Sequence, residues 1–208
     1  MSTSSDLSCP SCGVAVEGVS AHTRSLQCPH CANWVYLSGN GWTSAGLFEH
    51  AIDAPSMLRI GRRGTLVQTG DAPRPFVVAG RIRVTYSQGS WDEWWLEFED
   101  ANHQWLEEDD GSYQLHSTEN TTPDNTAVLA AKAGASLRVG ADSWFVTERI
   151  DAEVAGVGGT LPVATQPNEK MVCVDAIGNG REFSIEASGL DINITHSQAI
   201  PASALVWD

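Results

Sequence analysis

The sequence is poor in basic residues and in long apolar runs. Lys and Arg number 12 against 26 Asp and Glu, so the 208-residue chain has a formal net charge of −14. Such a charge repels polyanions, and we therefore predict no nucleic-acid partner. No apolar run approaches the roughly 18 residues that span a bilayer, and the polar start MSTSSDLS does not resemble an export signal. We expect a cytoplasmic protein that does not span a membrane.

Familiar catalytic motifs are also missing. The sequence has no nucleophile elbow, P-loop, HExxH helix or dinucleotide fingerprint, and the glycine run at 156–160 lacks a strand-turn-helix frame. The six histidines show no recognisable pairing with Ser, Cys or a carboxylate. Cys173 lies in the apolar run KMVCVDAI, which favours a buried, inert thiol. We therefore expect a protein that is not an enzyme.

Two CxxC pairs, separated by fifteen residues, are the strongest motif in the chain: Cys9, Cys12, Cys28 and Cys31. This spacing is typical of a zinc ribbon, in which four thiolates surround one Zn²⁺ tetrahedrally. Gly13 and Asn33 tolerate positive φ and suit the two tight turns. The motif predicts one structural zinc ion, with His22 and His30 exposed. The alternative, a redox dithiol, normally needs only one CxxC.

The rest of the chain has the short alternating runs and Gly, Asn and Ser turns of β structure. The fold class that this pattern predicts is mainly β: a small zinc ribbon, then a compact antiparallel β-barrel or sandwich-like domain. The acidic loop 107–110 is read as a solvated turn or a cation site. The expected divisions are a ribbon at 1–38, a linker at 39–57 and a β domain at 58–208, with candidate halves 58–115 and 127–208.

A weak repeat suggests an internal duplication of the β domain. LRIG at 58–61 and PFVVAGRI at 75–82 parallel LRVG at 137–140 and SWFVTERI at 143–150. The alternative is that two β-hairpins of this length resemble each other by chance.

The strand at 91–99 carries an unusual mixture of aromatic and acidic residues. Alternation places Trp94, Leu96 and Phe98 on a core face, and Trp91 and Trp95 on the other face with three glutamates. We expect this second face to be partly open and to bind a partner, with burial under the linker as the alternative.

Six of the twelve basic residues lie between positions 59 and 83. A hairpin closed by SQGS would bring Arg81 and Arg83 opposite the strand that carries Glu97 and Trp95, giving cross-strand ion pairs and Arg-on-Trp stacking. The glycine-flanked turn that carries Arg59, Arg62 and Arg63 is a candidate anion site for phosphate or a lipid headgroup.

The segments LRIGRRG, FVVAGRIRVTY, WDEWWLEFED and QWLEE resemble a bacterial family of uncharacterised domains numbered 4178 over about residues 9–190. The most specific element is the order G-R-I, W-D-E-W-W-L, W-L. The resemblance implies a compact, mainly β domain, often preceded by the same cysteine ribbon, with no assigned catalytic residue. It also implies an accessory role beside membrane-remodelling proteins, small membrane proteins and polyamine-synthesis-like enzymes.

Together these observations predict a non-enzymatic zinc-ribbon adaptor that binds a protein partner, in an envelope-stress or membrane-remodelling system. The alternative is a small enzyme or ligand-binding β domain with an anion or polyamine site.

Overall fold

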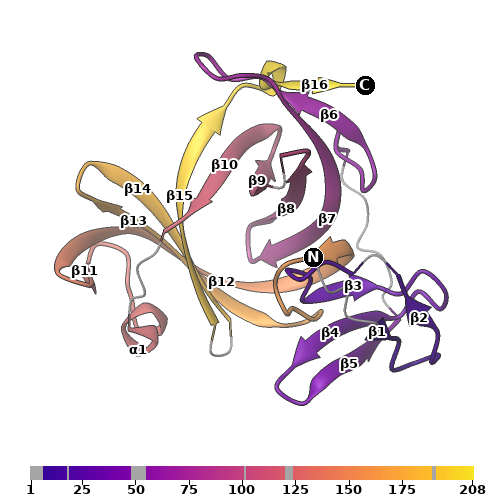
Figure 1. Ribbon diagram of the computed structural model, residues 1–208. Helices are drawn as coiled ribbons and strands as arrows, with labels where there is room; N and C mark the ends of the chain where they lie inside the picture. The colour runs from indigo at the N-terminus through magenta and orange to yellow at the C-terminus, as the bar shows by residue number, and fades with distance from the viewer. Residues whose placement is uncertain (1–6, 18, 48–54, 101, 120–123, 189–190) are drawn as a thin grey trace.

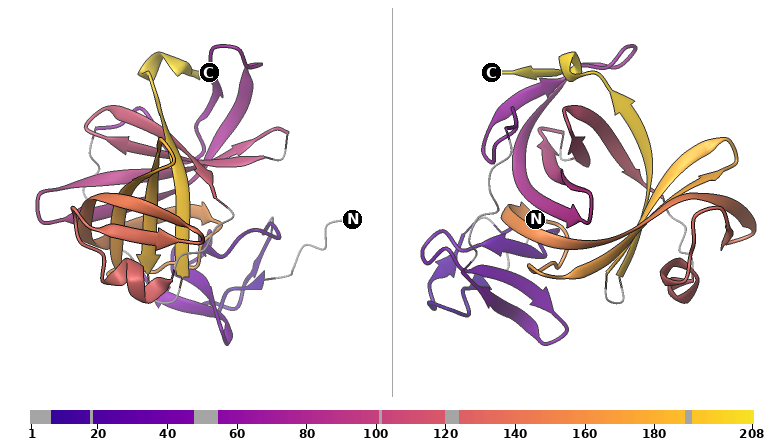
Figure 2. Two further views of the ribbon diagram at one scale, coloured as in Figure 1. Left: turned by 90° about the vertical axis from the view of Figure 1, so that its left-hand side faces the viewer. Right: turned by 180° about the vertical axis from the view of Figure 1, so that it is seen from behind.

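The computed structural model describes residues 7–17, 19–47, 55–100, 102–119, 124–188 and 191–208. Figures 1 and 2 show the N-terminal module, in indigo, beside a closed ring of strands, with β11 and α1 on the far side. The prediction of a mainly β chain is confirmed. The single α-helix in the described residues, α1 (Asn125–Leu129), begins at the N-cap Asp124, whose side chain accepts a hydrogen bond from Thr126 N.

The N-terminal module is built from short strands around the cysteines. They are β1 (Leu7–Ser8), β2 (Ala15–Val16), β3 (Ser25–Gln27), β4 (Trp34–Ser38) and β5 (Gly41–Gly46). Strand β5 pairs with β4, so the ribbon's sheet continues beyond the predicted end at residue 38. The predicted linker therefore begins with a ribbon strand, because SGNG at 38–41 turns the chain back instead of releasing it.

Eight antiparallel strands close into a β-barrel, in the order β7-β8-β9-β10-β15-β14-β13-β12, and β12 pairs back with β7. Their bounds are β7 (Arg74–Tyr86), β8 (Gly89–Phe98), β9 (His103–Asp109), β10 (Ser112–Thr118), β12 (Asp142–Leu161), β13 (Lys170–Gly178), β14 (Arg181–Ser188) and β15 (Asp191–Ile200). The shorter elements β6 (Arg63–Leu66), β11 (Ser136–Val139), η1 (Ala202–Ala204) and β16 (Leu205–Trp207) flank the barrel. Closure leaves the barrel wall without a free edge.

The two halves of the barrel repeat one arrangement. In each half, a short strand pairs with a long bulged strand, and three further antiparallel strands follow. The first half comprises β6–β10 and the second half comprises β11–β15. The bulges lie between Val78 and Gly80 in β7 and between Val146 and Glu148 in β12, at matching positions of the repeat. Of the repeated segments, LRVG overlaps β11 in its first three residues, whereas LRIG lies before β6. The arrangement favours an internal duplication.

Each long strand carries apolar residues on both faces, because one face lines the barrel and the other is covered. Val78, Trp94 and Leu96 pack outside the first half, under β6 and β16. Phe183 and Ile185 pack outside the second half, in a cluster that also contains Val128 of α1. This double burial explains why the strands read as nearly continuous apolar runs.

The ribbon and the barrel form one continuous sheet. Leu26 of β3 pairs with Thr160 at the end of β12. Ser25 Oγ donates to Val163 O at 2.7 Å, and Trp34 Nε1 donates to Thr165 O at 2.8 Å. The ribbon therefore packs against the end of the barrel at the loop that follows β12.

The register of the β7–β8 hairpin differs from the predicted one. Tyr86 pairs with Gly89, so the turn has two residues and places Arg83 opposite Asp92 and Arg81 opposite Trp94. The predicted cross-strand ion pairs and Arg-on-Trp contact are present, but the partners are Asp92 and Trp94 and not Glu97 and Trp95. Directly opposite residues of two paired strands share a face, so Arg81 and Arg83 lie with Asp92 and Trp94 on the outer face of the barrel.

Candidate metal centre and barrel lumen

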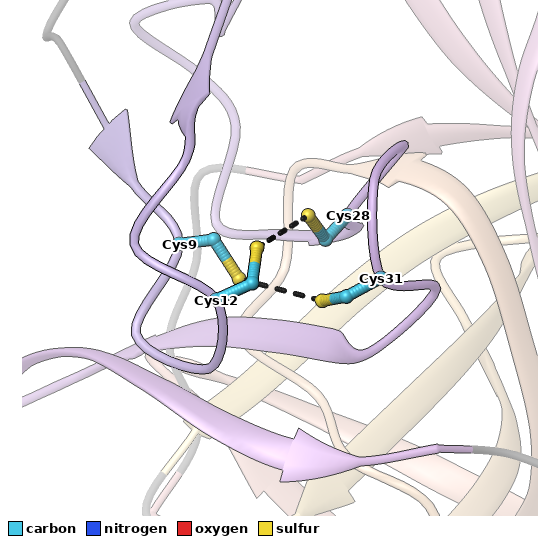
Figure 3. A group of neighbouring side chains, drawn as sticks. All are labelled: Cys9, Cys12, Cys28 and Cys31. Carbon is cyan, nitrogen blue, oxygen red and sulfur yellow. Dashed lines mark hydrogen bonds between the residues drawn. The ribbon is translucent and has the colours of Figure 1, made fainter.

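The four predicted cysteines form one cluster. All four sulfur atoms lie within 4.8 Å of one another, with Cys9 Sγ 3.8 Å from Cys31 Sγ and Cys12 Sγ 3.9 Å from Cys28 Sγ. Figure 3 shows the side chains converging from the two turns. Zinc–sulfur bonds of about 2.3 Å in a tetrahedron require sulfur–sulfur distances of about 3.8 Å, so the residues fit a four-thiolate zinc ion.

Backbone geometry prepares both turns for a metal. Gly13 N donates to Cys9 O at 2.8 Å, and Ala32 N donates to Cys28 O at 2.9 Å. The positive φ values are 74° at Gly13 and 57° at Ala32, so the second turn uses Ala32 where Asn33 was expected. Asn33 instead acts on the sulfur: its backbone N–H, helped by its side-chain amide, lowers the pKa of Cys31 to about 6. His22 and His30 are exposed, as predicted.

A cavity of about 510 Å³ lies inside the barrel. Every barrel strand supplies at least one lining side chain: Ile82, Glu93, Trp105, Thr118, Asn193, Glu186, Met171 and Val154. The loop at 162–165 and Arg24 of the ribbon complete the wall. The volume falls within the usual range for small-molecule sites, roughly 300–1,000 Å³.

The lumen is acidic. Glu93 and Glu186, on β8 and β14, hydrogen-bond to each other across the barrel, and Trp91 Nε1 donates to Glu93 Oε1 at 3.0 Å. Burial raises the pKa of both carboxyls, and the charge of Glu93 raises that of Glu186 further. Two carboxyls in hydrogen-bond contact share a proton, because two adjacent negative charges repel strongly at low dielectric.

Further ionisable groups surround this pair. Burial also raises the pKa of Asp175, which accepts a hydrogen bond from Ser184 Oγ at 2.8 Å. His116 is 8% exposed, and its Nδ1 lies 2.8 Å from Thr195 Oγ1. Its Nε2 lies 3.3 Å from Glu107 Oε2 but makes no hydrogen bond within the described chain.

Cys173 lies beside Glu186 on the neighbouring strand β13. Burial raises its thiol pKa far above the usual range. A thiol held in the protonated form is a poor nucleophile, which agrees with the prediction of an inert side chain.

A second cavity of about 890 Å³ lies outside the barrel, between β7–β10 and the segment at 55–60. Three of its charged groups, Arg81, Arg83 and Glu108, have partners. Asp92 bonds to Arg81 at 2.8 Å and to Arg83 at 2.9 Å. Glu108 accepts hydrogen bonds from Ser56 Oγ at 2.6 Å, Trp94 Nε1 at 3.0 Å and Tyr113 Oη at 3.0 Å. These contacts assign the polar groups a structural role.

The predicted acidic loop at 107–110 is mostly strand, because β9 continues to Asp109. Alternation separates its members: Glu107 lies opposite Glu93, whereas Glu108 lies opposite the outer residue Asp92. The four carboxylates therefore do not form a common cation site.

The predicted partner-binding residues are dispersed. Trp91 and Trp95 pack against the lumen cluster of Ile82, Val84 and Val154, so the expected outer face is an interior one. Arg62 donates to Met57 O and lies over the ring of Trp207 at 4.4 Å, whereas Arg59 lines the outer cavity. Arg63 is exposed at the start of β6. The three arginines of the predicted anion site thus have different surroundings.

Sequence reasoning placed Glu93 on the aromatic and acidic face of its strand and Glu107 in the acidic loop, but it did not bring them together with His116, Asp175 and Glu186. The signal was the alternation of acids with apolar residues in WDEWWLEFED and REFSIEA. Alternation indicates that the acids share a face, but only closure of the barrel makes that face an interior.

Comparison with known protein families identifies the family of the β domain. A family model described as "Domain of unknown function (DUF4178)" matches residues 64–202. The chain belongs to this family. The DUF4178 match covers the barrel from β6 to η1, and the cysteine ribbon precedes it. No curated protein and no solved structure matched the chain. Among the described residues, no helix is long and apolar enough to cross a membrane.

Proposed function

We propose that this DUF4178 protein binds a small molecule inside its barrel, and that a structural zinc ion in the ribbon supports one wall of the site. The observation that carries the proposal is the cavity of about 510 Å³, which all eight barrel strands line. Eight-stranded barrels either fill their lumen with side chains or hold one small ligand. Here apolar groups surround a few polar ones, which is the usual composition of a ligand site.

Zinc is the metal that the cysteine cluster suits best. Four thiolates complete a tetrahedral shell and leave no position for a catalytic water, so the ion would be structural. The ribbon is too small to fold on its own core, and metal binding would supply that folding energy. Arg24 and the 162–165 loop, which the ribbon contacts, line the cavity.

The adaptor hypothesis has weaker support. Its proposed aromatic anchors, Trp91 and Trp95, pack in the lumen cluster. A small ligand can reach that position more easily than the surface of a partner protein can. Interface anchors normally lie in a surface patch surrounded by polar residues. We therefore favour a non-catalytic, ligand-binding role.

The proposal is tested by native mass spectrometry of the purified protein, and by ligand-detected NMR with a panel of anionic, cationic and uncharged small molecules. Ser188 lines the cavity near the end of β14, and Ser188→Trp would fill part of it. We expect at least one compound class to bind the wild type, and this variant to abolish binding without loss of thermal stability. Binding that survives the substitution, or no binding by any class, would overturn the proposal.

A further inference from the structure

We infer that the ligand of the barrel lumen is a small organic cation, an ammonium group carried on an apolar chain. This inference rests on the proposed function and names its ligand class. The argument depends on the charges of the lumen face, on Glu93 and Glu186 lining one cavity, and on the apolar wall beside them.

The charge of the lumen face is one-sided. Glu93, Glu107, Asp175 and Glu186 lie on lumen positions of four different strands, as the cross-strand pairs Glu93–Glu107, Asp175–Ser184 and Cys173–Glu186 show. No Lys or Arg occupies a lumen position of the eight strands in the part of the chain that the structure describes. Arg24 lines the cavity from the ribbon, and its Nη1 donates to Ala21 O and Thr23 O. An anionic ligand would meet repulsion, whereas a cation would neutralise the wall.

Glu93 and Glu186 provide the recognition element. They come from opposite sides of the barrel, line the same cavity and lie close enough to interact, and Glu93 is only 8% exposed. An ammonium group has three donors and a full positive charge, so it can replace the shared proton and bond to both carboxylates.

His116 and Glu107 form a pair of their own on the lumen face. The His116 side chain is more than nine-tenths buried, and its position opposite Trp105 and Ser197 places it on that face. Its Nδ1 lies 2.8 Å from Thr195 Oγ1 and its Nε2 lies 3.3 Å from Glu107 Oε2, so both ring nitrogens have a neighbour within the protein. Glu93 and Glu186, which line the cavity, are therefore the carboxyls that a ligand would meet.

The apolar wall suits the remainder of such a ligand. Trp105, Ile82 and Met171 line the same cavity as the two glutamates. The face of an indole ring attracts an organic cation, and alkyl carbons lose unfavourable contact with water against such a wall.

A bare divalent metal ion fits less well. Within the described residues, the cysteine cluster is the one group of three or more His, Cys, Asp or Glu whose ligand atoms converge at metal-binding distance. The lumen carboxyls do not form such a group.

Isothermal titration calorimetry with hexylamine, hexan-1-ol and hexanoate at pH 7.5 tests the inference. The three probes share one chain and differ in charge. We expect hexylamine to bind at least tenfold more tightly than hexan-1-ol, and hexanoate to bind most weakly. Glu93→Gln and Glu186→Gln keep the side-chain shape, and each should weaken hexylamine binding at least tenfold.

Glu153→Gln is the matched control, because Glu153 lies on the outer side of β12 and pairs with Lys170. It should leave affinity unchanged, and melting curves of all three variants should show folded protein. If hexan-1-ol or hexanoate binds as tightly as hexylamine, in a manner that Ser188→Trp blocks, the cation inference is wrong and the proposed function stands. If hexylamine binds equally to both lumen variants, the inference is also wrong. If neither these probes nor the wider panel bind, both proposals are wrong.

Discussion

Glu186 and Asp92 are both surrounded by ionisable groups, but their environments have opposite consequences. Glu186 faces the like charges of Glu93, Glu107 and Asp175 across the lumen, which favours its protonated form. Asp92, on the outer face of the same barrel, lies between two arginines and is 4% exposed. The first arrangement leaves a site that favours a positive ligand, whereas the second is already complete and stabilises the fold.

The buried carboxyl of Glu186 should make the free energy of unfolding fall as pH rises. Burial and Glu93 raise the pKa of Glu186 in the folded state, so the folded protein holds a proton that the unfolded chain has lost above about pH 4.5. The groups that face it are Glu93, Glu107, Asp175, Cys173 and His116. Stability then decreases with pH by at most about 1.4 kcal/mol per pH unit for this proton.

Denaturant unfolding between pH 5 and 9 measures this linkage. Glu186→Gln removes the titrating group, so the variant should gain stability over the wild type as pH rises. A constant difference across this range would contradict the expected titration.

Replacing Asp92 should be costly. Asp92→Asn removes the carboxylate that bonds to Arg81 and Arg83 in a buried setting, and breaking such a pair typically costs about 3–5 kcal/mol. Asp100→Asn is the exposed control: Asp100 lies 3.9 Å from Arg74, and a surface pair is worth about 1 kcal/mol or less. Equilibrium unfolding in urea compares the two, and equal costs would refute the assigned structural role.

At the scale of elements, β12 connects the parts of the molecule. It pairs with β11, β13 and β7 and then reaches β3 of the ribbon. The glycines near its end allow this passage. Gly159 has φ of 70° and pairs with Gly80, and a Cβ on Gly159 would lie 2.1 Å from Ala79 O. Two glycines therefore permit a backbone approach that side chains would prevent.

Gly159→Ala should destabilise the barrel by a few kcal/mol, because it adds a backbone clash to an unfavourable positive φ. Gly180→Ala separates the two causes, since Gly180 has φ of 74° but open space around its Cβ position. The control should cost only about 1 kcal/mol. Thermal unfolding distinguishes them, and comparable losses would show that crowding at Gly159 has little importance.

Loss of the metal should affect the ribbon and the lumen together. We expect one zinc ion per chain by elemental analysis, because four thiolates complete the site. Cys28→Ser should remove the metal and unfold the ribbon while most of the barrel persists. Hydrogen exchange should then rise in β3–β5 and in the 162–165 loop. Cys173→Ser is the control that keeps zinc, and zinc content well below one in the wild type would refute the assignment.

At the scale of the whole molecule, the net charge and the closure of the barrel determine which class of ligand can bind. The net charge of −14 surrounds a barrel whose interior is also acidic. Arg24 is the only basic residue of the ribbon, so the metal module does not supply the cationic surface that zinc ribbons use on nucleic acids. The electrostatic field and the lumen thus favour the same class of ligand, a cation.

The protein should bind nucleic acid only weakly at physiological salt. The charge of −14 opposes the phosphate neutralisation that supplies most non-specific affinity. Fluorescence anisotropy with random DNA and RNA oligonucleotides checks this expectation. Micromolar or tighter binding that weakens steeply with added salt would contradict it.

The sequence by itself determined the features that depend on short-range pattern. The spacing of Cys9, Cys12, Cys28 and Cys31 predicted the cysteine cluster, because a tetrahedral site requires particular turns, and alternation predicted the strands and the two faces of β8. Only the tertiary structure decided what those faces meet. The two-residue turn after Tyr86 and the bulge at Val78 set the register, and pairing of β7 with β12 closed the barrel. That closure brought Glu93 and Glu186 together from strands far apart in the chain, since their contact depends on long-range pairing that no local pattern encodes.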